Sequence, residues 1–364
     1  MRNKSLALTV AVIASFALIA WSSASDEEPA GYLTTGTPAL ESIGALAFSP
    51  DGMLFVGDSQ GAAVYAIEMP EGSAAGAPLN VEGLDAKLAA MFGTTADDIT
   101  VRDMAIHPGS HDVYLSVARG DGNFAIVKVD GAGALSDVSL ADVRYAKGDI
   151  TNAPSPEATY RRNTPARQYT ITDLAFADGQ LMVAGLSNQE FASNFRRMPF
   201  PFTGEMDATS LEIFHVSHGQ FETHAPVDTF TPYRMNGGLH VVASYTCTPL
   251  VLFSVDGLDD GAHVMGTTVA ELGAGNRPLD ILAYNDGSDE FVLVANSRHP
   301  LMKIDAATFA GAEALVPPTE ETGVPFQALS QAGVQRMGER GDHIVMLQRT
   351  DAGLQLISVA KDAL

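Results

Sequence analysis

Cysteine, tryptophan and positive charge are scarce in this sequence of 364 residues. The single cysteine, Cys247, excludes an internal disulfide, so stability has to come from a hydrophobic core, which a chain of this length can build. There are 21 basic residues against 44 acidic ones, and the formal net charge is −23. Because phosphate would be repelled by such a surface, the charge disfavours nucleic acid and anionic membranes as partners and favours a soluble, acidic protein.

Several catalytic signatures are also missing. The sequence contains no G-x-S-x-G, no H-E-x-x-H, no C-x-x-C-H and no phosphate-binding loop. Their absence disfavours a serine hydrolase of that type, a zincin and a c-type cytochrome. No long apolar run follows the N-terminal one, and we expect no membrane insertion of the mature chain.

The N-terminus has the features of a secretory signal peptide. Arg2 and Lys4 precede an apolar run over residues 6–21, and small residues follow at Ser22–Ser25. The run is short for a membrane span of roughly 20 residues. We therefore expect residues 1–25 to be removed, and residues 26–364 to form a single domain that is periplasmic or secreted.

A repeat of strand, tight turn and strand recurs along the chain. It is clearest in four segments, of which three contain Asp-Gly between apolar runs, a strong hairpin signal. A further apolar strand follows each copy. Weaker copies over residues 239–255 and 334–359 complete the pattern. Radially stacked units of this kind predict an all-β propeller of about six blades, with seven as the alternative. The four clear segments are 44–57, 102–116, 172–185 and 279–295.

The remaining segments lie outside the repeat. Residues 32–37 are a candidate for the fourth strand of the last unit, which would close the ring. Residues 84–92 have helical spacing, with Asp85 as N-cap and Gly93 as stop. Two long loops, 142–168 and 187–209, are expected on the ligand-binding face, the second as a stiff lid or docking surface; a plug that packs Phe200 and Phe202 against the blades is its alternative.

Two short motifs connect these repeats to known proteins. The segments Leu46–Gly52 (LAFSPDG) and Asp103–Pro108 (DMAIHP) resemble exported propellers with YVTN/NHL-type and quinoprotein-amine-dehydrogenase-β-chain-like repeats. The resemblance extends over most of residues 40–360. It implies the propeller fold and an extracytoplasmic location, and no particular activity.

Alignment of the copies puts three acids, Asp103, Asp173 and Asp280, at one repeat position, where Ala45 stands in the first copy. The loops entering each innermost strand open on the axial face, so these carboxyl groups should gather there. One interpretation is that each accepts backbone N–H groups and ties one blade to the next. The other is an oxygen-rich site for calcium.

Arginine is concentrated in the loops assigned to the same face. Guanidinium groups suit carboxylate or phosphate, so this rim could bind an anionic small molecule or the acidic patch of a protein partner. The alternative is that these arginines pair with local acids and hold the loops. The candidate ligand-binding residues are Arg161, Arg162, Arg196, Arg197, Arg277, Arg298, Asn188 and Asn296.

A second possible metal site lies near the middle of the chain. A hairpin over residues 213–224 would pair His215 with Glu222 and put both on one face with His224. Cys247 is a possible additional soft ligand. Imidazole, carboxylate and thiolate suit copper or zinc, whereas a polar hairpin and a buried thiol need no metal. The sequence leaves open whether the chain is an enzyme; a ligand-binding propeller is favoured, with a metal-dependent enzyme or metal-handling protein as the alternative.

Overall fold

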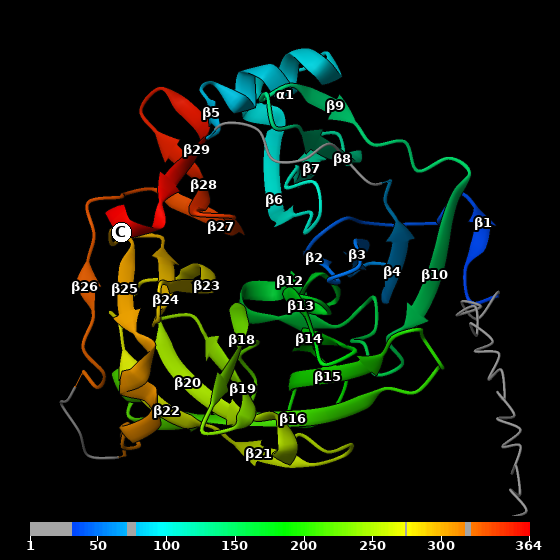
Figure 1. Ribbon diagram of the computed structural model, residues 1–364. Coiled ribbons are helices and arrows are strands. Elements are labelled where there is room, and N and C mark those ends of the chain that lie inside the picture. The colour runs from blue at the N-terminus through cyan, green and yellow to red at the C-terminus, as the bar shows by residue number, and fades with distance from the viewer. Residues whose placement is uncertain (1–30, 71–77, 274, 317–321) are drawn as a thin grey trace, which may run out of the picture.

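The computed structural model describes residues 31–70, 78–273, 275–316 and 322–364. The predicted signal peptide lies outside these ranges. Six mainly antiparallel sheets are arranged around a central axis, as Figure 1 shows, so the predicted six-bladed propeller is confirmed. No helix in the described part of the chain has the length and hydrophobicity that a bilayer span needs.

The first three blades are built mainly from residues 34–222. From the axis outward, blade 1 consists of β2 (Leu46–Phe48), β3 (Met53–Asp58), β4 (Ala63–Glu68), β10 (Val143–Asp149) and β1 (Thr34–Gly36). Blade 2 consists of β6 (Ile99–Ile106), β7 (Val113–Arg119), β8 (Phe124–Val129) and β9 (Leu135–Asp137). Blade 3 consists of β13 (Asp173–Ala177), β14 (Gln180–Leu186), β15 (Ser193–Pro199), β16 (Asp207–His215) and β17 (Gln220–Glu222), and β21 (His263–Met265) pairs with β16 in parallel.

The other three blades have four strands each. Blade 4 consists of β18 (Thr229–Met235), β19 (Gly238–Ser244), β20 (Pro249–Ser254) and β22 (Thr267–Glu271). Blade 5 consists of β23 (Pro278–Asp286), β24 (Asp289–Asn296), β25 (Met302–Asp305) and β26 (Gln327–Ala328). Blade 6 consists of β27 (Val334–Arg340), β28 (His343–Thr350), β29 (Gly353–Ala360) and β5 (Asn80–Val81).

Short elements connect the blades. The helix α1 (Leu84–Phe92) follows β5, and β11 (Thr159–Tyr160) pairs with β12 (Thr164–Pro165). The described 3₁₀ turns cover Ala96–Asp98, Arg161–Asn163, Ala166–Tyr169, Val216–His218, Val255–Gly257, Ala306–Gly311 and Lys361–Ala363.

The blades do not follow one another around the ring in sequence order. The innermost strand of blade 1, β2, lies between β6 of blade 2 and β13 of blade 3, and β6 also contacts β27 of blade 6. The order around the ring is therefore 2-1-3-4-5-6 (Figure 1). The chain leaves blade 2, returns to blade 1 through β10, which pairs with β4, and only then enters blade 3. The first part of the predicted loop 142–168 is thus an outer strand.

The ring is closed by β5, which pairs with β29 and supplies the fourth strand of blade 6. The prediction that residues 32–37 close the last unit is wrong, because β1 pairs with β10 on the outer edge of blade 1. Burial explains the difference. Val81 is 3% exposed and packs in the core between blades 2 and 6, whereas two of the three β1 residues are exposed.

The helix α1 has the predicted bounds and ends at Gly93, which has a left-handed φ of 66° that glycine adopts easily. Leu84 and Leu88 are completely buried against the core of blades 2 and 6. The predicted N-cap is wrong, since Gly83 occupies that position. Asp85 lies in the first turn and forms an ion pair with Arg349 of β28, with 2.7 Å between Nη1 and Oδ2.

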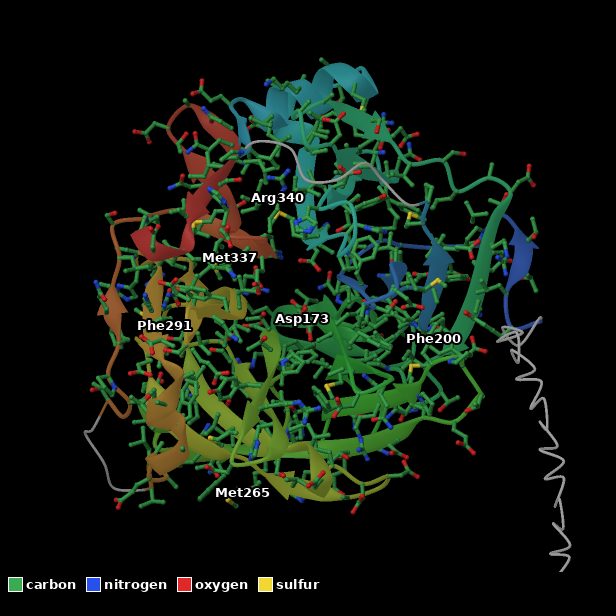
Figure 2. The ribbon with its side chains drawn as sticks, in the orientation of Figure 1. Asp173, Phe200, Met265, Phe291, Met337 and Arg340 are labelled. Atoms are coloured by element: carbon green, nitrogen blue, oxygen red, sulfur yellow. The ribbon has the colours of Figure 1, made fainter. Side chains whose placement is uncertain are left out.

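The segment 187–209 was expected to be a loop over the ligand face, and its centre is strand β15. After β15, Phe200 packs edge-on against Phe55 of blade 1, with 5.0 Å between the ring centroids, and Phe202 packs beside both rings. Figure 2 shows Phe200 far from Asp173, which lies near the axis. The lid prediction is therefore wrong, and the segment seals the junction of blades 1 and 3.

Candidate functional site

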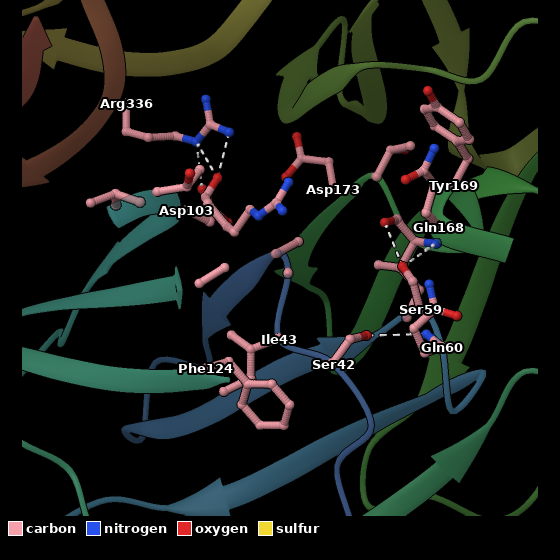
Figure 3. A pocket seen from close by; sticks show the side chains of 18 of the residues that line it. Ser42, Ile43, Ser59, Gln60, Asp103, Phe124, Gln168, Tyr169, Asp173 and Arg336 are labelled. Carbon is pink, nitrogen blue, oxygen red and sulfur yellow. Dashed lines mark hydrogen bonds and ion pairs between the residues drawn. The ribbon is translucent and has the colours of Figure 1, made fainter. Parts of the chain in front are cut away.

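A cavity of about 600 Å³ occupies the axis of the propeller, and all six blades contribute to its wall. It opens on the face where the innermost strands begin and where the loops β3–β4 and β7–β8 turn, which is the face expected from the sequence. Figure 3 shows polar side chains around it, including Ser42, Gln60 and Gln168. A cavity of this size suits a small-molecule ligand.

The floor of the cavity is a ring of six residues at one repeat position. Each of them comes one residue before an apolar residue of the innermost strand that packs inward. The strand registers pair five of the six with the second strand of their own blade. Ala45, just before β2, accepts from the N–H of Gly57 in the second strand. All six line the cavity. In order around the ring they are Ala45, Asp103, Arg336, Asp280, Thr229 and Asp173.

Each aspartate of the ring accepts a hydrogen bond from the neighbouring blade. The Asp103 carboxylate accepts from the N–H of Leu46 in blade 1 at 2.7 Å, and that of Asp280 accepts from the N–H of Met337 in blade 6 at 2.5 Å. The same contact joins Asp173 to the N–H of Phe230 in blade 4 at 2.8 Å. These bonds have the blade-tying geometry of the first interpretation. A calcium ion at the same ring stays a prediction.

Arg336 fills the ring position of blade 6 and links three blades. Its Nε lies 3.1 Å from Oδ1 of Asp103, as the dashed lines in Figure 3 show. The guanidinium group also donates to the backbone carbonyls of Arg102 in blade 2 and Leu279 in blade 5. One half-buried cation is therefore held against Asp103 and two backbone carbonyls by a fork of donors that lysine could not reproduce.

Burial makes the aspartates poor acids. Desolvation raises the pKa of Asp103 and of Asp280, and Arg336 opposes the rise at both. Desolvation together with the charge of Asp103 raises the pKa of Asp173 to about 7. Hydrogen bonds, and not Arg336, oppose this rise in the pKa of Asp173. Asp173 can thus exchange a proton near neutral pH.

The wall above the floor carries both signs of charge. Arg277 lies 3.6 Å from Asp228, measured from Nη2 to Oδ1, and Arg119 forms an ion pair with Asp121 at 2.9 Å. The exposed guanidinium group of Arg102 has no hydrogen-bond or ion-pair partner among the described residues. Arg102 is therefore the cation on the wall that is most available to a ligand. The charged lining residues are Glu41, Arg102, Asp103, Arg119, Asp228, Asp173, Arg277, Asp280 and Arg336.

Of the arginines predicted to bind a ligand, only Arg277 lines this cavity. Arg161 lies 3.6 Å from Glu222 and over the ring of Tyr160, which contacts the wall residue Tyr169. Arg162 and Arg298 are exposed and lie outside the lining.

Two further predicted arginines are structural. Arg196 is completely buried in β15 and donates to Asn152, to the carbonyl of Thr170 and to the carbonyl of Leu186. Desolvation lowers its pKa to about 9. Arg197 pairs with Asp207 of the adjacent strand at 2.8 Å. Arg197 therefore pairs with a local acid, as the alternative interpretation predicted, whereas Arg196 is held by an amide oxygen and two backbone carbonyls.

The two predicted asparagines also lie away from the cavity lining. Asn296 is buried at the end of β24, where its side chain accepts from Asn276 and donates to the carbonyl of Val294. Asn188 is exposed, and its N–H donates to the carbonyl of Asn152.

The predicted soft-metal residues are only partly brought together. The register of β16 and β17 pairs Ile213 with Glu222, so the predicted pairing of His215 with Glu222 is off by two residues. His215 and Glu222 still share a face, and Nδ1 of His215 lies 3.0 Å from Oε2 of Glu222. His224 is exposed outside the group, and its place is taken by His218, which gathers with His215 and Cys247 into a possible metal-binding group.

Comparison with known proteins supplies no family. No family model matches the chain, and no curated protein matches it. Among solved structures, the PQQ-bound aldose sugar dehydrogenase of Streptomyces coelicolor is 14% identical at a TM-score of 0.33, over 91% of this chain and 97% of that one. The hydrazine synthase of Kuenenia stuttgartiensis is 11% identical at a TM-score of 0.36, over 89% and 97%. Similarity this low carries no inference about ligand or activity.

Proposed function

We propose that the chain is an exported ligand-binding propeller whose axial cavity binds a small organic anion that also carries hydroxyl or amino groups. The observation that carries the proposal is the division of charge along the axis. A guanidinium group without a partner among the described residues, that of Arg102, lies on the wall, and a floor of half-buried carboxyl groups lies below it. An anionic group would bind at Arg102 and Arg277, and donors on the same molecule would face the floor.

The charged groups that line the cavity favour a ligand with both an anionic group and hydrogen-bond donors over one that carries negative charge alone. Five carboxyl groups and four guanidinium groups line the cavity. Arg336 and Arg119 are already engaged, so a ligand carrying only negative charge would meet repulsion from the floor. Hydroxyl or ammonium donors remove that repulsion because the carboxyl groups of Asp103, Asp173 and Asp280 offer oxygen acceptors at the axis.

The depth of the site favours a small molecule over a protein surface. The floor groups line the bottom of a cavity of about 600 Å³. A protein partner with a flat surface would reach few of these groups with its side chains. A protein partner that binds the rim would contact Arg102 and Arg277 without the floor. The two cases therefore differ in whether floor substitutions affect binding.

A ligand panel tests the proposal. Hydroxy acids, amino acids, sugar phosphates and neutral sugars are screened by thermal shift, and the hits are measured by calorimetry. We expect hits among the anions that carry donors, and a loss of about 10- to 100-fold in affinity for Arg102→Ala, since a hydrogen bond to a charged group contributes roughly 1.5–3 kcal/mol. Thr229→Val, on the floor, should weaken the same ligands.

Arg162→Ala is the matched control, because Arg162 is an exposed arginine of the same face that does not line the cavity. Its affinity should equal that of the wild type. Equal affinities for Arg102→Ala and the wild type would refute the proposal. Loss with Arg102→Ala but not with Thr229→Val would assign the rim to a protein partner instead.

Export is the second part of the proposal, and it rests on the N-terminal sequence. Expressed with its own N-terminus, the mature chain should begin near Ser25 or Asp26 and be recovered from the periplasm or the medium. Intact mass spectrometry measures the new N-terminus. A product that retains Met1 in the membrane fraction would contradict export.

A further inference from the structure

A cluster of nitrogen and sulfur donors lies off the axis, where the outer part of blade 3 meets blade 4. His215 ends β16, His218 lies in the 3₁₀ turn that follows, and Cys247 lies in the turn between β19 and β20. A ring nitrogen of each histidine and the sulfur of Cys247 all lie within 4.8 Å of one another. None of the three lines the axial cavity, so the cluster is a separate site.

Glu222 of β17 orients both imidazoles. Its Oε2 lies 3.0 Å from Nδ1 of His215, and its Oε1 lies 3.3 Å from Nδ1 of His218. The two rings are 4.1 Å apart between centroids. A carboxylate on Nδ1 fixes the ring and leaves Nε2 as the metal-binding nitrogen, the usual arrangement in metal sites held by histidine.

The free nitrogen of His215 is the observation that points to a ligand. The residue is 2% exposed, and its Nε2 is buried without a hydrogen-bond partner among the described residues. A buried polar atom with no partner is costly and uncommon in a folded protein. A structural histidine would use both ring nitrogens, whereas in His215 one is held by Glu222 and the other is left over.

The backbone holds the thiol in an unusual conformation. Cys247 and Thr248 both have positive φ angles, 70° and 56°, and the second is rare for a β-branched residue. The N–H of Cys247 donates to the carbonyl of Asn276 at 2.7 Å, and Oγ1 of Thr248 donates to that of Gly273 at 3.2 Å. Strained turns held by their surroundings concentrate at functional sites.

We propose that His215, His218 and Cys247 bind one transition-metal ion, with Glu222 as the residue that orients the two histidines. Two imidazoles and one thiolate are the donors that zinc and copper prefer, whereas calcium and magnesium require oxygen ligands. The three ligands leave a coordination position open to solvent or substrate, since His218 is 41% exposed.

The surrounding charge suits a dication. Glu222 places a carboxylate in hydrogen-bond contact with Nδ1 of both His215 and His218, and a negative group at this distance favours a cation at the site. A second carboxyl group, that of Glu271 at the end of β22, is buried nearby and interacts electrostatically with His215 and His218. A metal ion binds as the Cys247 thiol loses its proton, so the net gain of positive charge at the site is one.

Titration of the metal-free mature chain with Zn²⁺, Co²⁺ and Cu²⁺, each alone, tests the site. We expect one ion per chain, and for Co²⁺ and Cu²⁺ an intense thiolate-to-metal absorption band. Cys247→Ser should abolish that band, and Glu222→Gln should weaken binding roughly 10- to 100-fold through the orientation of the histidines. His218→Ala keeps the buried His215 and should lose affinity with the fold intact by circular dichroism.

His224→Ala is the control, because His224 lies close in sequence but is exposed outside the cluster. Its affinity and its spectra should match those of the wild type. The proposal is overturned if the wild type binds no stoichiometric ion, or if Cys247→Ser and His218→Ala bind it as tightly as the wild type does. Because the readout is metal binding alone, the result is independent of whether the axial cavity takes a ligand.

Discussion

Removing the cation at the floor of the axial cavity should unfold the propeller at much lower denaturant concentration. Arg336→Met keeps the length and the apolar stem of the side chain but deletes its charge and its donors. The variant loses the ion pair with Asp103 and the bonds to the carbonyls of Arg102 and Leu279. Asp103 and Asp280 are then left near each other at the axis without a counter-ion.

The size of the effect follows from burial. Removing one partner of a buried ion pair costs about 3–5 kcal/mol. The side chains of Arg336 and Asp103 are 24% and 16% exposed, so the penalty is partly screened. We therefore expect the free energy of unfolding to fall by about 2–4 kcal/mol at pH 8.

The penalty should shrink in acid. Arg336 lowers the pKa of Asp103 and of Asp280, so its removal raises both further. An acid whose pKa is raised by folding contributes stability below its unfolded pKa of about 4, and this stability is lost as the pH rises toward the folded pKa. The difference between wild type and variant should therefore be small near pH 4.5 and grow toward pH 8.

Urea denaturation at both pH values measures the two free energies. Arg144→Met is the matched control: Arg144 and Glu68 are 50% and 44% exposed, and their 2.8 Å contact is shorter than the 3.1 Å of the floor pair. An exposed pair should contribute less than about 1 kcal/mol at either pH. Equal losses for the two variants, or a penalty for Arg336→Met that grows in acid, would refute the reasoning.

Three further outcomes follow from the structure. Val81→Asp buries a charge in the strand that closes blade 6 and should leave little soluble protein, whereas Thr35→Asp in β1, where the side chain is exposed, should leave the melting temperature close to that of the wild type; equal solubility of the two would contradict closure by β5. Phe200→Ala should lower the free energy of unfolding, measured by urea denaturation, by about 3–4 kcal/mol and leave ligand affinity unchanged. A selective loss of affinity would instead support the prediction that this segment is a lid. The raised pKa of Asp173 makes the wild-type free energy of unfolding decline between pH 4 and pH 7, and Asp173→Asn should reduce that decline. An unchanged slope would contradict the raised pKa.

The blades could be predicted because each is a local hairpin pattern. Asp51-Gly52 and Asp178-Gly179 mark turns between alternating apolar strands, and both glycines have positive φ. The order of the blades could not be predicted in this way. Strand β10 has no Asp-Gly partner of its own and pairs with β4 across the whole of blade 2, a long-range contact that leaves no local signal.

Part of the floor of the cavity could be predicted from the sequence. Asp103, Asp173 and Asp280 follow from repeat alignment. Extending the alignment to the weaker copies would have found Arg336, because Val334–Gly338 (VQRMG) matches Val101–Ala105 (VRDMA). Loop arginines were a poor guide, since a guanidinium group can equally well brace a blade, as Arg196 does.

The off-axis cluster of His215, His218 and Cys247 could also be predicted only in part. His215 and Cys247 were candidates, but the register of the hairpin decides which second histidine joins them, and a turn of three residues brings in His218 in place of His224. A two-residue slip preserves the face of a strand, so alternation alone could not separate the two pairings.

Filling the axial cavity tests the central claim most directly. Thr100 is exposed on the cavity wall, at the start of β6 and away from the floor, so Thr100→Trp should occupy the space and leave the fold intact. Calorimetric titration with the tightest ligand of the panel compares this variant with the wild type. We predict that the variant melts at the wild-type temperature and binds at least about 100-fold more weakly. Wild-type affinity in a folded Thr100→Trp variant would show that the ligand binds elsewhere.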